Sequence, residues 1–341
     1  MPVLQTARHR TRYLETGPPG GPLMIFVHGW PELGIAWRRE IDHFAARGWR
    51  CVAPDMRGYG GSSVPADLAA YALPETVRDM VELHDALGGE PAVWVGHDWG
   101  APVVWNLAAQ HADRCRAVAN LCVPYFSQGF GLANLLPLVD RELYPADAFP
   151  YGQWDYYRFY TEAFDQVAAD FEADVAGTLT LLFRRGRPDV VGKPARAARL
   201  RENGGWFGAA HRAPRLPRDE GMLSPADFAT FVEAFTATGF RGAGAWYVND
   251  DANLAYAATA PDGGRLRMPV LFVHAAWDTI CDTVHSRLAE PMRAGCADLT
   301  EVTVDSGHDV LLERPDAVNA AIEGWLATKS LASWVGEPPG L

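Results

Sequence analysis

Short runs of apolar residues alternate with helical patterns over the first 124 residues. The apolar runs predict buried strands at 23–27, 49–54, 92–95 and 117–122. Helical spacing of apolar positions predicts helices at 34–47, 74–88 and 101–111. Strands that alternate with helices of this length predict an α/β fold with a mainly parallel sheet flanked by helices. In such sheets the ligand site lies beyond the carboxyl ends of the strands.

The pattern changes between about residues 123 and 262, where apolar strand runs disappear and aromatic, proline-rich and arginine-rich segments replace them. Helical patterns in this region cover 157–184, with a break inside, and 225–238. Strand patterns return at 269–274 and 299–304, and a closing helix is predicted near 315–328. We therefore expect a core in two parts, a helical cap inserted between them and a loose tail. The corresponding ranges are 1–124 and 262–333 for the core, 125–261 for the cap and 334–341 for the tail.

Composition narrows the class of protein. Of the 341 residues 48% are hydrophobic and 21% are charged, which is typical of a packed globular chain. The formal net charge of −12 disfavours nucleic-acid binding, because an acidic surface repels phosphate. No apolar stretch is long enough to span a membrane, and the first residues lack the apolar segment of a signal peptide, so we expect a cytoplasmic location. The five cysteines lie far apart without a zinc-binding spacing, which predicts reduced, buried thiols and no metal.

The motif Gly96-His97-Asp98-Trp99-Gly100 lies between a predicted strand and a predicted helix. Its two glycines permit the tight turn that presents a nucleophile above the sheet, as in the G-x-S-x-G motif. The central residue here is an aspartate, and the chain contains neither G-x-S-x-G nor G-x-C-x-G. A carboxylate at this turn can attack an electrophilic sp³ carbon and form an alkyl–enzyme ester. We expect Asp98 to be such a nucleophile; the alternative is a surface turn whose aspartate caps the following helix.

Candidates for the acid and the general base follow later in the chain, in the order that this kind of turn requires. Asp278 lies four residues after the predicted strand that ends at His274, and His308 follows the next predicted strand. Asp282 is a rival for the acid. We expect His308 to act as the general base and Asp278 to orient it.

The turn after the first strong strand predicts part of an oxyanion hole. The sequence His28-Gly29-Trp30-Pro31 can direct a backbone N–H toward the nucleophile, so that the N–H groups of Trp30 and Trp99 would hold an oxyanion. Pro31 is compatible with a cis peptide bond. A plain tight turn is the alternative interpretation.

Four motifs resemble those of the soluble epoxide hydrolases of the α/β-hydrolase fold. They are HGWPE at 28–32, DMRGYGGSS at 55–63, GHDWG at 96–100 and SGH at 306–308. The similarity continues into the cap. The sequence FRGAGAWY at 240–247 resembles the segment that carries one of the family's two ring-opening tyrosines, and DYYRFY at 155–160 resembles the segment that carries the other.

The resemblance implies further site residues. It points to Tyr247 as one donor to the epoxide oxygen, and a gap-free count back from LFR at 182–184 selects Tyr157 as the other, with Tyr156 and Tyr160 as rivals. Phenols remain protonated at neutral pH and can donate to a developing alkoxide. Three tryptophans are expected to line the substrate pocket: Trp30, Trp99 and Trp246. Five residues are expected to shape the motifs: His28, Gly29, Pro31, Gly96 and Gly100.

The function that the resemblance implies is hydrolysis of an epoxide to a vicinal diol, through an ester on Asp98 and without metal or organic cofactor. The expected partners are water and a mainly apolar epoxide, in a monomer or homodimer with a role in detoxification. One alternative is a haloalkane or haloacid dehalogenase, for which Trp99 would suit a halide. Against it, Trp99 replaces the arginine of the fluoroacetate type and Trp30 the asparagine of the haloalkane type. A non-catalytic protein that binds a small ligand is the second alternative.

Overall fold

The computed structural model describes residues 1–331, and its centre is a sheet of eight strands in the order β1-β2-β4-β3-β5-β6-β7-β8. The first two strands are antiparallel, and β3 to β8 run parallel. The prediction of a mainly parallel sheet is therefore confirmed. The strands are β1 (Val3–Gln5), β2 (Arg10–Thr16), β3 (Leu23–Val27), β4 (Arg50–Pro54), β5 (Ala92–His97), β6 (Cys115–Leu121), β7 (Leu266–Ala275) and β8 (Cys296–Val304).

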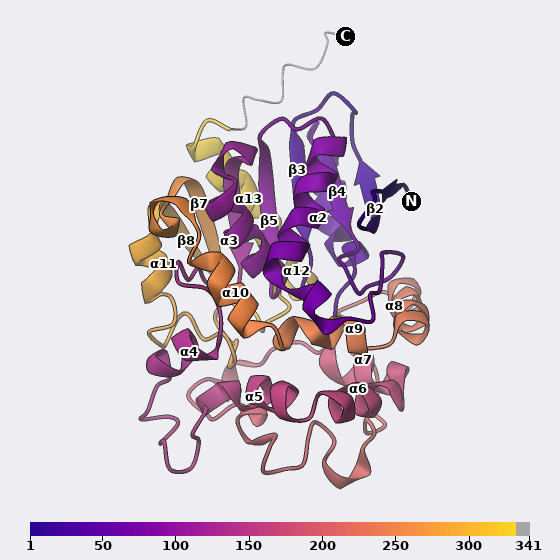
Figure 1. Cartoon of the computed structure of the whole chain (residues 1–341), viewed down its shortest axis with the longest axis vertical. Coiled ribbons are helices and arrows are strands. Elements are labelled where there is room, and N and C mark those ends of the chain that lie inside the picture. The colour runs from indigo at the N-terminus through magenta and orange to yellow at the C-terminus, as the bar shows by residue number, and fades with distance from the viewer. Residues whose placement is uncertain (332–341) are drawn as a thin grey trace.

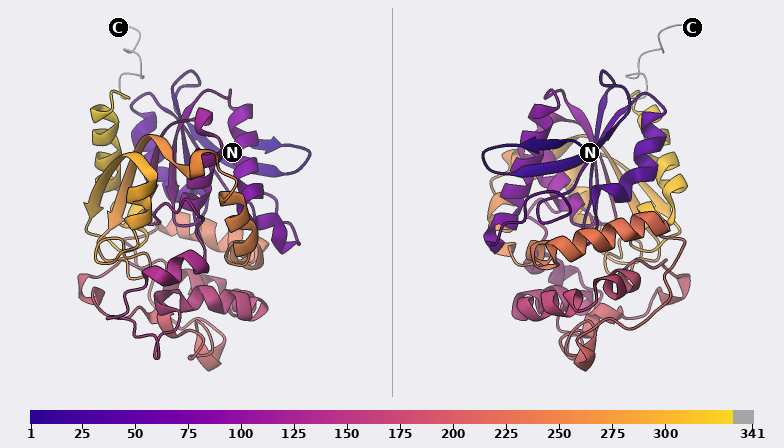
Figure 2. Two further views of the ribbon diagram at one scale, coloured as in Figure 1. Left: turned by 60° about the vertical axis from the view of Figure 1, so that its left-hand side comes forward. Right: turned by 90° about the vertical axis from the view of Figure 1, so that its right-hand side faces the viewer.

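Helices cover both faces of the sheet, and a separate helical layer lies beyond one end of it (Figures 1 and 2). Helices α2 and α3 pack on one face, and α1 and α13 pack together on the other. The helices of the core are α1 (Arg38–Ala45), α2 (Leu73–Ala86), α3 (Gly100–Gln110), α11 (Glu290–Gly295), α12 (Val310–Glu313) and α13 (Pro315–Thr328). Those between β6 and β7 are α4 (Leu132–Leu135), α5 (Asp155–Glu162), α6 (Phe164–Glu172), α7 (Val175–Leu182), α8 (Pro225–Thr238), α9 (Arg241–Gly244) and α10 (Asp250–Ala257).

The strands follow the apolar pattern because parallel strands in this fold are buried on both faces. Every residue of β3 and β5 is buried, as continuous apolar runs predict. The sequence pattern did not predict β1 and β2. Strand β2 has the sequence RTRYLET and pairs antiparallel with β4 near the edge of the sheet, so most of its side chains remain partly or fully exposed and carry no apolar run.

Side-chain caps begin two helices of the inserted region, α7 and α8. The predicted break in 157–184 divides the segment into α5, α6 and α7, and the side chain of Asp174 caps α7 by accepting from the Gly177 N–H. Helix α8 begins after Ser224, whose hydroxyl accepts from the Asp227 N–H, and ends before Gly239 at φ 70°. The predicted tail 334–341 lies outside the described residues.

The carboxyl ends of the parallel strands meet at the edge of the sheet that faces the inserted helices (Figure 1). The loops that follow β3, β5, β7 and β8 carry the four predicted site positions Trp30, Asp98, Asp278 and His308. Topology thus brings together residues that are more than two hundred positions apart in the chain. Within residues 1–331, no helix combines the length and the apolar character needed to cross a membrane.

Candidate active site

Asp98 occupies a strained turn between β5 and α3. Its φ of 47° lies in the left-handed region, which aspartate tolerates better than most residues. Close approach requires glycine at two positions near this turn, Gly29 in the loop after β3 and Gly100 at the start of α3. A Cβ on Gly29 would lie 2.4 Å from the Asp98 Cβ, and a Cβ on Gly100 would lie 2.2 Å from the Val27 carbonyl oxygen. The sequence therefore folds here into an elbow that holds the carboxylate above the sheet edge.

His308 lies between two carboxylates. Its Nε2 is 3.1 Å from Asp98 Oδ2, and its Nδ1 is 2.5 Å from Asp278 Oδ2. The other oxygen of Asp278 accepts hydrogen bonds from the Ile280 and Cys281 N–H groups, at 2.9 and 3.0 Å. These bonds orient the acid toward the imidazole. The three predicted members of the triad are thus brought together from the ends of β5, β7 and β8.

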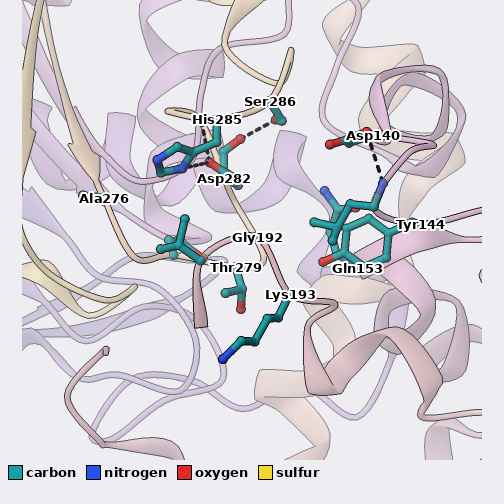
Figure 3. Close-up of a pocket in the computed structure, with 13 residues that line it drawn as sticks. Asp140, Tyr144, Gln153, Gly192, Lys193, Ala276, Thr279, Asp282, His285 and Ser286 are labelled. Carbon is teal, nitrogen blue, oxygen red and sulfur yellow. Dashed lines mark hydrogen bonds and ion pairs between the residues drawn. The ribbon is translucent and has the colours of Figure 1, made fainter. Parts of the chain in front are cut away.

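The rival acid, Asp282, points elsewhere. Its Oδ1 accepts from the N–H groups of Val284 and His285 and makes no contact with His308. It lines a second, much smaller pocket (Figure 3). Lys193 and Thr279 line the same pocket. The geometry therefore pairs the histidine with Asp278.

Mutual charge determines the protonation of the triad. Burial alone would lower the pKa of His308, but Asp278 and Asp98 together raise it well above its ordinary value. Burial would raise the pKa of Asp98 and of Asp278, yet the neighbouring His308 lowers the pKa of both carboxyl groups. The resting arrangement is therefore an imidazolium between two carboxylates, with Asp98 ionised as a nucleophile requires.

One of the two predicted oxyanion donors contacts the nucleophile. The Trp30 N–H donates to Asp98 Oδ1 at 2.6 Å, and the Trp30–Pro31 peptide bond is cis. Among the described residues, the Trp99 N–H, which precedes α3, makes no hydrogen bond to Asp98. The turn after β3 thus supplies a donor at the position that the sequence predicts.

A largely apolar cavity opens onto Asp98 and His308. It is lined by Trp30, Pro31, Asp98, Tyr156, Leu182, Trp206, Tyr247, Ile280, Cys281, His308 and Asp309. This lining corrects the prediction for two of the three tryptophans that were expected to face the substrate. Trp99 packs its ring against neighbouring aromatic side chains, and Trp246 is buried with its indole N–H donated to the Arg57 carbonyl, so neither faces the cavity. Trp206 takes a place in the wall that no sequence motif indicated.

Tyr156, a rival in the sequence analysis, takes the place in the cavity that was predicted for Tyr157. Tyr247 and Tyr156 line the cavity, with ring centroids 5.7 Å apart, whereas Tyr157 turns away and donates its hydroxyl to Asp250. Successive residues of an α-helix point about 100° apart, so a shift of one position in the alignment selects a different face. Tyr160 also stays out of the cavity lining, stacked on the ring of Tyr247 at 4.3 Å. The gap-free count could not resolve this difference of one residue.

A buried pair that the sequence analysis did not single out links the oxyanion turn to the base. Glu32 accepts from the Gly29 N–H at 2.8 Å and lies 3.1 Å from His97 Nδ1. The other ring nitrogen of His97 lies 2.8 Å from the carbonyl oxygen of His308. Burial lowers the pKa of His97, but Glu32 more than offsets this and the pKa is raised well above its ordinary value. Glutamate within the HGWPE motif was the available sequence signal.

Two groups of side chains in residues 1–331 are close enough to share a metal ion. They are His97, Cys122 and His308, and Asp278, Cys281 and His308. Both groups need His308, whose ring nitrogens already face Asp98 and Asp278. The His308 nitrogens that either group would need are therefore committed to the triad.

Asp309 is an unexpected polar member of the cavity wall. Within residues 1–331 its carboxyl group has no hydrogen bond or ion pair, and burial raises its pKa to about 7. The folded protein thus keeps this carboxyl group protonated to about pH 7, whereas the unfolded chain ionises it near pH 4. Between these pH values the folded state binds a proton that the unfolded chain has released. The free energy of unfolding therefore falls as the pH rises from one value to the other.

We expect Asp309→Asn to relieve this penalty at high pH. The variant should gain stability over the wild type as the pH rises from 5 to 8, by up to about 3 kcal/mol in the free energy of unfolding. Urea unfolding at both pH values measures the difference. Asp305→Asn, at an exposed position of the same loop, controls for loss of a surface charge. A difference between Asp309→Asn and the wild type that does not change with pH would contradict the expectation.

Comparisons with known proteins agree with this geometry. Residues 22–315 match the family model described as alpha/beta hydrolase fold. Epoxide hydrolase A of Mycobacterium tuberculosis is 35% identical, covering 94% of this chain and 95% of that protein. Bifunctional epoxide hydrolase 2 of Sus scrofa is 31% identical over 94% of this chain, which spans 53% of that longer protein.

Solved structures of similar proteins extend the agreement to three dimensions. The crystal structure of epoxide hydrolase A from Mycobacterium thermoresistibile has a TM-score of 0.76 and 30% identity, covering 96% of this chain and 97% of that one. An epoxide hydrolase from an endophytic Streptomyces has a TM-score of 0.77 and 29% identity, covering 97% and 96% of the two chains. The overall fold is thus shared with solved epoxide hydrolases over nearly the whole chain. The chain belongs to the epoxide hydrolases of the α/β-hydrolase fold family.

Proposed function

We propose that the protein hydrolyses a mainly apolar epoxide to a vicinal diol through an ester on Asp98. The observation that carries this proposal is the arrangement of one cavity. An ionised aspartate paired with a His–Asp couple lies in its wall, and the two phenols of Tyr156 and Tyr247 lie in the same wall. Nucleophile, base and proton donors therefore surround one space.

Ring opening is the first step. Asp98 attacks an epoxide carbon, the C–O bond breaks, and its electron pair moves to the ring oxygen, which takes a proton from Tyr156 or Tyr247. Burial raises the pKa of both phenols well above their ordinary value, so both are protonated at neutral pH. This assignment replaces the expected Tyr157 by Tyr156.

Ester hydrolysis is the second step, and formation of the ester prepares its own base. Once Asp98 is esterified, its negative charge is gone and one of the two carboxylates that raise the pKa of His308 no longer acts. The imidazolium then gives up its proton, which returns through solvent to the tyrosinate. Neutral His308, oriented by Asp278, deprotonates the water that attacks the ester carbonyl. The Trp30 N–H, with the Trp99 N–H as second donor, holds the oxyanion. When the oxyanion collapses, the ester C–O bond breaks and the departing alkoxide takes the proton from the His308 imidazolium, which releases the diol. The carboxylic acid left on Asp98 then gives its proton to the imidazole, which restores the resting pair.

The cavity wall indicates the class of substrate. Most of its side chains are aromatic or aliphatic, and its acidic and basic members are Asp98, Asp309 and His308. No lysine or arginine faces the cavity within the described part of the chain, so neutral apolar epoxides fit it better than epoxides that carry a carboxylate. The Trp99 indole lies outside the wall, which gives no support to a halide site for a dehalogenase.

A single turnover in H₂¹⁸O tests the ester mechanism. With excess enzyme and styrene oxide, the diol of the first turnover should carry little label, and mass analysis should find ¹⁸O in the peptide that contains Asp98, because water attacks the ester carbonyl. A haloalkane serves as the comparison substrate. Heavily labelled diol in the first turnover would mean direct attack by water, and released halide without diol would indicate a dehalogenase.

A cytoplasmic location and a role in detoxification remain parts of the proposal. All five cysteines are free and buried, which supports a reducing compartment. A largely apolar cavity without lysine or arginine supports the processing of varied apolar epoxides. Either a monomer or a homodimer is compatible with a site built from one chain.

A further inference from the structure

Tyr157 and Asp250 form a hydrogen bond that connects two separate segments beside the cavity. Tyr157 lies on α5 and its side chain is buried. Its hydroxyl group donates to Oδ1 of Asp250, at the start of α10. The other oxygen of Asp250 accepts from the Leu132 N–H at 3.0 Å. Both oxygens of one carboxyl group are therefore used to join three parts of the chain.

Each end of this bond lies next to one of the phenols in the cavity. Tyr156 precedes Tyr157 on α5 and points about 100° away from it, so anchoring Tyr157 sets the rotation of the helix that aims Tyr156. Tyr247 lies three residues before Asp250, at the end of the short helix 245–247. The Asn249 side chain ties this segment to the core by donating to the carbonyl oxygens of Leu68 and Ala245, at 2.9 and 2.8 Å.

The two phenols are not held by hydrogen bonds of their own. Within residues 1–331, neither the Tyr156 nor the Tyr247 hydroxyl group has a hydrogen-bond partner, and both rings are positioned by aromatic packing. Among the hydrogen bonds of the described residues, the bond from Tyr157 to Asp250 alone joins α5 to the segment 240–257. Packing tolerates small slides and rotations, whereas a hydrogen bond to a carboxylate is directional. The bond therefore adds a directional constraint to the aromatic packing between α5 and Tyr247.

We propose that Tyr157 and Asp250 are a positioning pair that holds Tyr156 and Tyr247 at the separation needed to bind one epoxide oxygen. This inference rests on the proposed function, since it concerns the donors of the ring-opening step. Tyr157 does not contact the substrate and acts through Tyr156. Ester hydrolysis, which uses His308 and Asp278, does not depend on the pair.

A double-mutant cycle on single-turnover rates tests the pair. Tyr157→Phe should slow formation of the ester about 10-fold and leave its hydrolysis within about 2-fold of the wild type. Tyr156→Phe should slow ester formation further, by about 100-fold, because a donor itself is lost. Adding Tyr157→Phe to Tyr156→Phe should then have no further effect on ester formation. A general structural defect would instead slow both steps.

Tyr125→Phe is the matched control, because it also removes a buried hydroxyl group with a single acceptor, the Gly264 carbonyl, away from the cavity. It should lower the melting temperature about as much as Tyr157→Phe and leave ester formation unchanged. The proposal would be overturned if Tyr157→Phe formed the ester at the wild-type rate. It would also be overturned if the effects of Tyr157→Phe and Tyr156→Phe on ester formation multiplied in the double mutant. If Tyr157→Phe abolished ring opening while Tyr156→Phe retained it, Tyr157 itself would be the donor. Labelled diol in the H₂¹⁸O experiment would instead refute the proposed function.

Discussion

Asp98→Asn is expected to lower kcat for epoxide hydrolysis by at least about 10⁴-fold, because the amide cannot form the ester. Asparagine suits the turn, since it tolerates a φ of 47° as readily as aspartate does, and its side-chain oxygen can still accept from the Trp30 N–H. The variant should therefore fold like the wild type. Diol formation under steady-state conditions measures the loss, and intact-protein mass spectrometry should detect no adduct.

Asp305→Asn provides the comparison for this experiment, because it changes the same kind of side chain on an exposed loop near His308. Its kcat should stay within about 2-fold of the wild type, as expected for a surface substitution. Turnover by the Asp98 variant at a rate near that of the wild type would show that water attacks the epoxide directly.

His308→Gln is expected to stop the reaction halfway. The carboxylate nucleophile and both cavity phenols remain, so the ester should form, but without a base its hydrolysis should slow by at least about 10³-fold. Mass spectrometry should then show each chain carrying one added substrate molecule after mixing with an epoxide. The wild type should show this adduct only transiently.

His285→Gln is the matched control for the loss of an imidazole, since His285 is exposed and lines the second pocket (Figure 3). It should turn over without accumulating an adduct. If His308→Gln neither formed an adduct nor produced diol, His308 would be required for ring opening, and its role as base for the second step alone would be wrong. The pair of variants thus separates the two steps of the reaction.

Much of the site could be predicted from local pattern. A nucleophile, an acid and a base that each follow a strand of a parallel sheet must lie at the same edge, so the order Asp98, Asp278 and His308 already implies their proximity. The glycines of the motif could be recognised from the same local pattern, although the space they leave is needed by neighbouring strands, through the Val27 carbonyl at Gly100 and the Asn120 side chain at Gly96. The pattern did not reach β1 and β2, whose polar residues lie at an exposed edge.

The sequence pattern could not decide which tyrosine of α5 faces the cavity. Tyr156 and Tyr157 have the same chemistry and adjacent positions, and the orientation of α5 separates them by packing one toward the cavity and the other toward Asp250. Asp250 lies 93 positions further along the chain, so no local signal connects it to Tyr157. The same holds for Trp206, which enters the cavity wall from a segment without regular pattern.

The sequence alone therefore determined the alternation of buried strands with helices, the mainly parallel sheet, the family and the candidate nucleophile, because these depend on periodicity and on short motifs. Tertiary structure decided which side chains face the substrate, which phenol of α5 enters the cavity, and that Asp309 lies unpaired beside the base. These outcomes depend on the rotation of a helix about its axis and on contacts between distant segments. Packing of the whole chain sets the rotation of the helix and the distant contacts. The periodicity of apolar residues along the chain carries no information about them.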